Sequence, residues 1–241
     1  MNITFYNAFT ALQAHQRHVE QISHNIANVN TPGFKTQNVR FEDVLYTQMN
    51  MNNPASMLRG HGVRVGTILS DFQQGPLRTT NQMLDFAIMG PGFFAKETPQ
   101  GVVYTRQGAF NLGSVGDQTY LVDFEGNFVL DTQQQRIELN STTLSTEDIS
   151  FIKDRLGIFQ FDNVQGLVKD NQTGFLESEA SRQSYIDNNA PTTLVQGAIE
   201  LSNMNLMDGM VALMEGQKAI QVNARVIQTA DQLEEMINNL R

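Results

Sequence analysis

The sequence predicts an α+β protein in which long N- and C-terminal helices pair as a coiled coil around an inserted, mainly antiparallel β domain. Apolar residues recur at helical spacing near both ends of the 241-residue chain, which predicts the two helices. Between them, short apolar runs alternate with Gly and Pro without βαβ alternation, which predicts antiparallel strands. The expected segments are an N-terminal coiled-coil helix at 1–30, an extended connecting segment at 31–62, the β domain at 63–190 and a C-terminal coiled-coil helix at 191–241.

The N-terminal helix has a narrow apolar seam. Its members are spaced alternately three and four residues apart, and all but His15 are apolar: Phe5, Ala8, Leu12, His15, Val19, Ile22, Ile26 and Val29. Two seam residues in every seven is the pattern of a coiled coil, whereas a helix in a globular core has a wider apolar face. This seam therefore needs a partner to cover it.

The run NIANVNTPGFK, residues 25–35, predicts an abrupt end to this helix. Asn28 and Asn30 tolerate the left-handed conformation found at helix ends. Pro32 then supplies a fixed φ, and Gly33 supplies the positive φ that a type II turn requires. We expect Gly33 to have positive φ and to redirect the chain from the helix toward the β domain.

The C-terminal helix is predicted from about Leu201 to Leu240, a stretch without proline. A helical pattern longer than ~25 residues favours a coiled coil or a helical array, although an ordinary helical bundle is an alternative. Gly209 and Gly216 each cost roughly 1 kcal/mol inside a helix, which indicates close packing or a local bend. Two apolar stripes follow the helix, the first through Ala219, Val222, Val226, Ala230, Leu233, Ile237 and Leu240, and the second through Leu206, Leu213, Ile220 and Ile227.

These two stripes are wider than one narrow N-terminal seam can cover, which favours assembly with further copies. We expect the assembly interface to consist of apolar residues of both helices: Phe5, Leu12, Val19, Ile22, Ile26, Leu213, Ile220, Val226, Ile227, Leu233 and Ile237. The turn signature that follows the first helix is Asn28, Thr31, Pro32, Gly33 and Phe34.

The β domain is predicted from short apolar runs in the middle of the chain. The candidate strands are 63–69, 84–89, 92–96, 102–106, 119–123, 127–131 and 157–161. Residues 124–127 indicate a tight hairpin turn rather than a calcium loop, because the spacing of an EF-hand is missing. Residues 145–148 predict a short helical turn, and the polar stretch 163–193 predicts a looped return to the last helix.

Charge and residue types argue against several functions. Of the net charge of −9, all lies in residues 69–200, because the ends at 1–68 and 201–241 carry +2 and −2. An acidic chain offers no patch for nucleic-acid phosphates, and no window of ~18 apolar residues could span a membrane. The chain has no cysteine and no G-x-S-x-G motif, and His15 and His18 lack a well-placed third ligand. We expect no enzyme activity, cofactor or metal.

Three segments follow the pattern of a known family. The first is Ala27-Asn28 with Thr31-Pro32-Gly33-Phe34-Lys35, the second is 62–94, and the third is 195–232, which includes Glu200, Ser202-Asn203 and Asn205-Leu206. Together they resemble the axial proteins of the bacterial flagellum, the rod and hook subunits, and Phe41–Tyr46 is similar to the corresponding segment of distal-rod members.

The resemblance implies a structural subunit of the flagellar basal-body rod that assembles into a helical hollow tube and transmits torque. The implied partners are copies of itself, other rod and hook proteins and the flagellar export apparatus. The N-terminus has no basic region followed by a continuous apolar block, so we expect export without a cleaved signal peptide. The alternatives are a proximal-rod or hook-type relative in the same family, and a soluble helical-hairpin adaptor that binds a partner helix.

Overall fold

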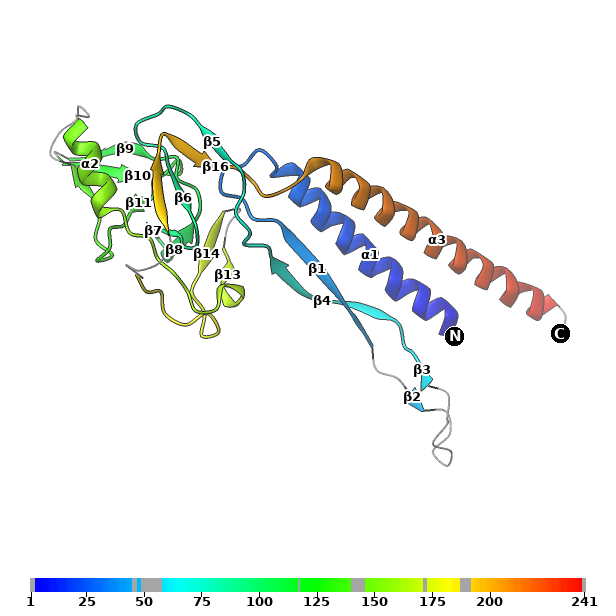
Figure 1. The fold of residues 1–241 in the computed structure, drawn as a ribbon. Coiled ribbons are helices and arrows are strands. Elements are labelled where there is room, and N and C mark those ends of the chain that lie inside the picture. The colour runs from blue at the N-terminus through cyan, green and yellow to red at the C-terminus, as the bar shows by residue number, and fades with distance from the viewer. Residues whose placement is uncertain are drawn as a thin grey trace. The chain divides into compact units, whose positions relative to one another are not determined.

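The structure, a computed structural model, describes residues 3–44, 47–48, 58–116, 118–139, 146–170, 173–186 and 192–239. They form two compact units. The helical unit comprises Met1–Ala27, Gln37–Asp71 and Asn205–Arg241, and the β unit comprises Asn28–Thr36 and Phe72–Met204. An N-terminal helix, antiparallel sheets and a C-terminal helix confirm the predicted α+β class (Figure 1).

The helical unit contains the two long helices and a two-stranded ribbon. Helix α1 spans Ile3–Ala27 and helix α3 spans Leu206–Asn239. The ribbon pairs β1 (Gln37–Asp43) with β4 (Val63–Ser70) in antiparallel register, with an irregularity between Val39 and Phe41, and it lies along α1 (Figure 1). The short strands β2 (Thr47–Gln48) and β3 (Leu58–Arg59) also pair with each other.

The structure differs from the sequence-based expectation on both sides of the β domain. Residues 37–43, expected to be part of a connection, are a paired strand whose side chains are mostly exposed, so they lack the alternating burial that would have indicated it. The last helix begins at Leu206 because the side chain of Asn205 accepts a hydrogen bond from the N–H of Met207 (3.0 Å), as an N-cap does. Residues 193–196 and 198–200, which were expected to belong to the C-terminal helix, are strands.

The β unit is built around one antiparallel sheet. Its strands are β5 (Leu77–Thr79), β6 (Phe86–Met89), β7 (Phe94–Thr98), β8 (Gly101–Thr105), β9 (Asn111–Val115), β10 (Gln118–Val122), β11 (Phe128–Val129), β12 (Glu138–Leu139), β13 (Val168–Lys169), β14 (Gly174–Leu176), β15 (Thr193–Gln196) and β16 (Ala198–Glu200). The main sheet has the order β12-β10-β11-β7-β8-β14-β13, with β9 paired to β10; β15 pairs with β6, and β16 with β5. Helix α2 (Thr146–Arg155) and a 3-10 turn, η1 (Val164–Gly166), complete the unit.

The main sheet is covered on both faces. Successive side chains of a strand point to opposite faces, and Phe93 and Phe94 accordingly belong to two different apolar clusters. One cluster includes Leu121, Val129 and the α2 residue Ile152, and the other is a group of aromatic rings around Tyr104 and Phe175. A sheet buried on both sides gives this unit a substantial core of its own.

The predicted hairpin turn at 124–127 is confirmed. Strands β10 and β11 pair across it, and the carboxylate of Asp123 accepts hydrogen bonds from the backbone N–H groups of Glu125 (2.8 Å) and Asn127 (3.0 Å). The ammonium of Lys96 lies 2.6 Å from the same carboxylate and is buried. These contacts account for the acidic residues of the loop without a bound ion.

Other local expectations were partly wrong. Residues 157–161 form isolated bridges, Phe93 with Phe159 and Gln160 with Tyr185, rather than a strand. The expected turn at 145–148 is the start of helix α2, which continues to Arg155, and Ser145 itself lies outside the described residues. The polar return at 163–193 contains η1, β13 and β14.

Candidate assembly interface

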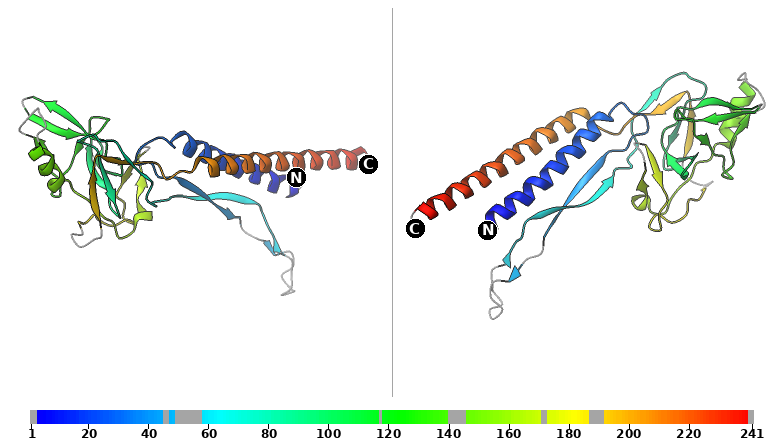
Figure 2. Two further views of the ribbon diagram at one scale, coloured as in Figure 1. Left: turned by 45° about the horizontal axis from the view of Figure 1, so that its top comes forward. Right: turned by 180° about the vertical axis from the view of Figure 1, so that it is seen from behind.

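Helices α1 and α3 lie side by side and run antiparallel, with the N-terminus of α1 and the C-terminus of α3 at the same end (Figures 1 and 2). The predicted seam of α1 takes part in this contact. A Cβ atom added to Gly216 of α3 would lie only 2.6 Å from a methyl group of Val19 in α1. The glycine therefore lets the two helices approach closely.

The closest line of α3 runs along the edge of the first stripe that the sequence predicted, with which it shares Ala230. It consists of small residues seven positions apart, of which Gly209, Gly216 and Ala230 are buried and Asn223 is half-buried. Seven residues are close to two helical turns, so these positions share one face. Their regular spacing was the signal in the sequence, where the two glycines alone indicated only close packing or a local bend.

The predicted interface residues have different environments in the single chain. Ile22 is buried, whereas Phe5, Leu12, Val19 and Ile26 of α1 are half-buried, as are Leu213, Ile220, Val226 and Ile227 of α3. By contrast, Leu233 is 54% exposed and Ile237 is 64% exposed. The helix pair thus covers part of the predicted surface and leaves the end of α3 uncovered.

A second uncovered apolar surface lies on α3 away from α1. We call it the outer face of α3; its large apolar residues are at least 49% exposed and are Met207, Met210, Val211, Met214 and Val222. Met210 and Val211 lie three and four residues after Met207, Met214 lies four and three residues after them, and Val222 lies eight residues after Met214, which places them all on one side of a helix. On α1, Tyr6 and Phe9 are also about half exposed, at 49% and 50%. A group of exposed large apolar side chains on one side of a helix is a candidate interaction site.

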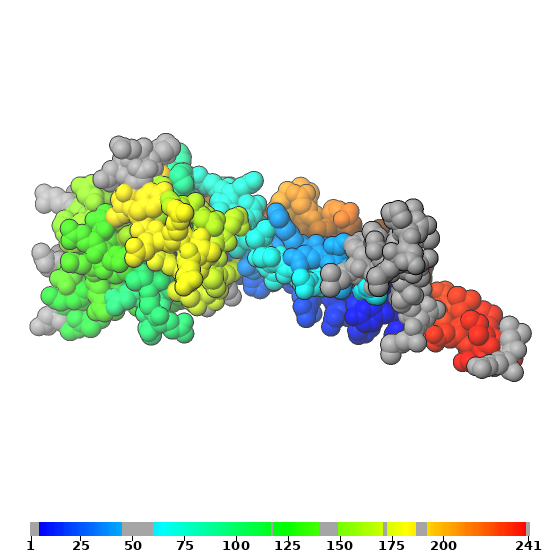
Figure 3. All heavy atoms as spheres, turned by 90° about the horizontal axis from the view of Figure 1, so that it is seen from below, coloured from blue at the N-terminus to red at the C-terminus, as the bar shows by residue number. Residues whose placement is uncertain are grey.

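The end of α3 extends beyond α1. Helix α3 has 34 residues and α1 has 25, and Val19 lies beside Gly216, so the start of α1 reaches only as far as about residue 232 of α3. Every residue from 231 to 239 is exposed. Figure 3 shows this red end of α3 extending beyond the dark-blue start of α1. We call residues 231–239 the α3 tail.

The turn signature has the predicted backbone geometry. Gly33 has φ of +70°, and the N–H of Phe34 donates to the carbonyl of Thr31 (3.3 Å), which closes a turn of the type II kind. Asn28 does not adopt the left-handed conformation; its carbonyl and side-chain oxygens instead accept hydrogen bonds from Thr31 (3.1 and 3.2 Å). The N–H of Gly33 donates to the carbonyl of Glu200 (2.8 Å), so the turn is attached to β16.

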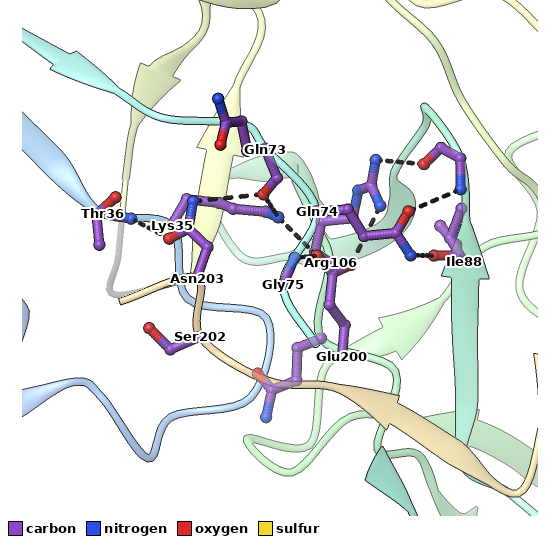
Figure 4. A network of polar contacts seen from close by, with 12 residues as sticks. Lys35, Thr36, Gln73, Gln74, Gly75, Ile88, Arg106, Glu200, Ser202 and Asn203 are labelled. Atoms are coloured by element: carbon purple, nitrogen blue, oxygen red, sulfur yellow. Dashed lines mark hydrogen bonds and ion pairs between the residues drawn. The ribbon is translucent and has the colours of Figure 1, made fainter. Parts of the chain in front are cut away.

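Next to this turn, a buried group of three charges joins three distant segments of the β unit (Figure 4). Glu200 accepts one bond from the ammonium of Lys35 (2.6 Å) and one from the guanidinium of Arg106 (3.1 Å). The N–H of Gly75 donates to the same carboxylate (2.9 Å), and Lys35 also donates to the carbonyl of Gln73 (2.6 Å). The side chains of Lys35 and Glu200 have no exposed surface.

This buried ionic group was not predicted from the sequence. Lys35 and Glu200 are in the segments that carry the family resemblance, but nothing in the sequence pairs them across 165 positions. The available signal was that Glu200 lies between Ile199 and Leu201, because a carboxylate within an apolar run is buried only with a partner. Burial lowers the pKa of Arg106, against the opposing effect of Glu200.

Two further groups are close to predicted residues. The Phe34 ring is fully buried, and the ammonium of Lys169 lies 4.4 Å from its centre and has no hydrogen-bond partner among the described residues. Burial lowers the pKa of Lys169 to about 8. In the helical unit, His15 and His18 both pack against the ring of Phe41 on β1, and burial followed by the charge of His15 lowers the pKa of His18. These histidines have a packing role.

Among the described residues, no cluster of three or more His, Asp or Glu side chains is placed to hold a metal ion. No described helix combines the length and apolar character needed to cross a membrane. The chemistry of the site is therefore that of contact surfaces: apolar helix faces, a glycine turn and a buried ionic group.

The chain matches three protein-family descriptions. Residues 5–35 match "Flagella basal body rod protein", residues 87–154 match "Flagellar hook protein FlgE/F/G D1 domain", and residues 195–240 match "Flagellar basal body rod FlgEFG protein C-terminal". The turn signature lies in the first match, and the whole of α3 lies in the third.

Individual relatives cover nearly the whole chain. The flagellar basal-body rod protein FlgG of Borreliella burgdorferi is 32% identical over 98% of this chain and 97% of its own length. FlgG of Caulobacter vibrioides is 31% identical over 97% of both chains, and the rod protein FlgF of Mesorhizobium japonicum is 29% identical over 100% of this chain and 98% of its own. The chain therefore belongs to the flagellar axial family of rod and hook proteins, is similar over its whole length to FlgG, and is a structural subunit of the flagellar basal-body rod.

Proposed function

We propose that this subunit polymerises with copies of itself into a helical hollow rod that transmits torque, and that α1 and α3 pair as a coiled coil at its centre. The observation that carries the proposal is the apolar surface left uncovered when α1 and α3 have packed together. If the two predicted seams buried each other completely, no apolar surface would remain for another copy to cover. In this structure, the outer face of α3 and the α3 tail are uncovered.

The kind of contact follows from which residues are uncovered. The uncovered residues of α3 form a different surface from the α1 side of the helix pair. A second copy that binds to this surface of α3 would therefore do so through a different surface of its own. Contacts between unlike surfaces do not close a dimer, and they grow into rings or helical filaments. A rod is an open helical assembly, which agrees with this geometry.

Its partners under this proposal are copies of itself, neighbouring rod and hook proteins and the flagellar export apparatus. The family supports them, since relatives named as rod proteins align over nearly the full chain. Similarity to both FlgG and FlgF relatives keeps a proximal-rod position as the second candidate. A soluble adaptor that binds one partner helix would need a single groove. The uncovered apolar residues instead lie at several places along α3, between Met207 and Ile237.

The proposal is tested by placing a charge on the outer face of α3. Met214 is 52% exposed and does not face α1, so Met214→Asp leaves the helix pair intact. In an assembled rod the aspartate would be buried without a partner, which costs several kcal/mol, so we expect loss of rods and motility in a bacterium carrying only this variant. Met214→Leu keeps size and polarity, costs less than about 1.5 kcal/mol and should retain both. Normal rods with the aspartate would refute assembly through this face.

A further inference from the structure

The helical unit has a groove on the side of α1 that is turned away from α3. Its volume is about 300 Å³, and its walls are residues of α1 and of the chain around β4: Tyr6, Thr10, Gln13, Ala14, Arg17, Val44, Val63, Arg64 and Val65. The lining mixes apolar side chains with the polar Thr10 and Gln13, and its charged members among the described residues are the two arginines. Arg17 forms no ion pair with the described residues, and Arg64 shares one with Glu42 (3.0 Å).

The α3 tail has the complementary chemistry. It contains three acidic residues and no basic one, Asp231, Glu234 and Glu235. None of these has an ion pair within the described part of the chain. Ile237 lies four residues after Leu233 and three after Glu234, so it neighbours both an aliphatic side chain and a carboxylate on the helix surface. The aliphatic side chains are 54% and 64% exposed.

The tail of a chain does not reach the groove of the same chain. Val19 of α1 faces α3, and Arg17 is two positions away, hence on nearly the opposite side of the helix. The tail also extends past the start of α1, whereas the groove extends along α1 from Tyr6 to Arg17. Only a second copy can therefore bring a tail into this groove.

We infer that the groove binds the α3 tail of a neighbouring copy, with Leu233 and Ile237 in its apolar part and Glu234 beside Arg17. The inference rests on the proposed self-assembly and specifies one of its contacts. Each copy has one groove and one tail, and these are different surfaces. A copy that uses its tail still has a free groove, so the contact can add further copies and does not close into a dimer. The charges of the chain ends agree with it, +2 for residues 1–68 and −2 for residues 201–241.

A cysteine cross-link tests the contact directly, since the natural chain has no cysteine. The purified full-length double variant Gln13→Cys/Ile237→Cys is oxidised under conditions in which the unmodified chain sediments as a polymer. We expect a ladder of cross-linked trimers and larger species on a non-reducing gel. Each single variant can give no more than a dimer. Gln16→Cys/Ile237→Cys, with an exposed cysteine outside the groove, should give no ladder.

Charge exchange gives an independent measurement on the same surfaces. Arg17→Glu and Glu234→Arg should each weaken association on the order of tenfold, because each places like charges together. Combining both in one chain restores opposite charges in every contact and should restore association. The combination of Glu234→Arg with Arg40→Glu, an exposed arginine outside the groove, should not restore it.

The outcomes separate this contact from assembly in general. If the chain polymerises but the groove pair cross-links no better than the Gln16 control, the inference is wrong and assembly uses other surfaces. A failure of the charge exchange to restore association would also overturn it. If the chain forms no polymer, the proposed assembly itself fails, and the contact with it.

Discussion

Gly33 meets two requirements that only glycine satisfies. Its φ of +70° is in the left-handed region, where a Cβ costs roughly 1–2 kcal/mol. In addition, a Cβ at this position would lie 2.5 Å from the backbone nitrogen of Gln107 and 2.7 Å from the carbonyl carbon of Arg106. Backbone atoms cannot move aside as a flexible side chain can, so the β unit must deform if any larger residue is placed here.

Gly33→Ala should therefore destabilise the β unit by more than its backbone conformation alone explains. Gly126 provides the matched control, because it has φ of +85° with nothing within 4 Å of an added Cβ. We expect Gly126→Ala to cost about 1 kcal/mol of unfolding free energy and Gly33→Ala to cost at least ~2 kcal/mol more. Urea unfolding of the two variants measures the difference, and equal losses would contradict the contact with residues 106 and 107.

Glu200 holds two buried cations, so its charge matters more than its size. Loss of the negative charge would leave Lys35 and Arg106 buried together without a counter-ion. Breaking a buried ion pair from one side costs about 3–5 kcal/mol, whereas an exposed pair contributes about 0–1 kcal/mol. The backbone carbonyl of Glu200 also accepts the hydrogen bond from the N–H of Gly33, which joins the turn signature to β16.

Glu200→Gln should lower the unfolding free energy of the β unit by several kcal/mol, with Glu97→Gln as the control. Glu97 pairs with Arg136 at the surface, at 2.7 Å, and the two side chains are 39% and 47% exposed. The same chemical change there should cost less than about 1 kcal/mol. Denaturant titration of both variants, followed by circular dichroism, makes the comparison. A loss at Glu200 no larger than at Glu97 would show that the buried group adds no stability.

Among the elements, the α1–α3 pair depends on small residues. Gly216 lies against Val19, and the same face of α3 carries Gly209 and Ala230. A glycine inside a helix costs roughly 1 kcal/mol relative to alanine, and this cost is offset only if close approach of the helices stabilises the pair. The glycines thus set the distance between the two helices.

Gly216→Leu should separate the helices and weaken the helical unit by about 1–3 kcal/mol, the range for overpacked sites. Gln217→Leu, at the exposed neighbouring position, adds the same side chain without meeting α1 and should cost little. Val19→Ala should recover part of the loss when combined with Gly216→Leu, because it removes the methyl groups in the way. The stability of each variant is measured by thermal unfolding, followed by the far-ultraviolet circular dichroism of the helices. If Val19→Ala recovers none of the lost stability, Val19 does not contact residue 216.

The sequence predicted the elements whose signal is local. Helix α1 and the turn at Gly33 were found because a seven-residue seam and a Pro-Gly pair each act within a few residues. Strands β7, β8 and β10 were found because their burial on both faces gives continuous apolar runs. Their existence, although not every boundary, was thus contained in neighbouring residues.

The elements that were missed depend on distant partners. Strand β1 is largely exposed and is fixed by pairing with β4, and β15 and β16 are short strands fixed by pairing with β6 and β5. The ionic group at Glu200 was missed for the same reason, since its three side chains come from positions 35, 106 and 200. Pairing across such separations leaves no periodic trace in a single sequence.

At the scale of the whole molecule, the two units differ in how much they bury. Both large apolar clusters belong to the β unit. In the helical unit, the buried apolar residues among those described are Ala8, Ala14, Ile22 and Ala230, three of them alanines. Small cores supply little stability, and helices depend mainly on the packing of their apolar faces. The helical unit therefore gains little stability from its own core, which is what the proposed assembly with other copies would supplement.

The stability of the helical unit should consequently depend on protein concentration, while that of the β unit should not. Binding that occurs only in the folded state stabilises that state by mass action. We expect hydrogen exchange in dilute solution to show weak protection over residues 5–28 and strong protection over 94–105, where β7 pairs with β8. Raising the concentration should increase protection in α1 and α3 alone, and Met214→Asp should abolish the increase. Strong protection of residues 5–28 in the dilute monomer would mean that the helix pair is complete without neighbours, and that the uncovered residues of α3 are not needed to hold it.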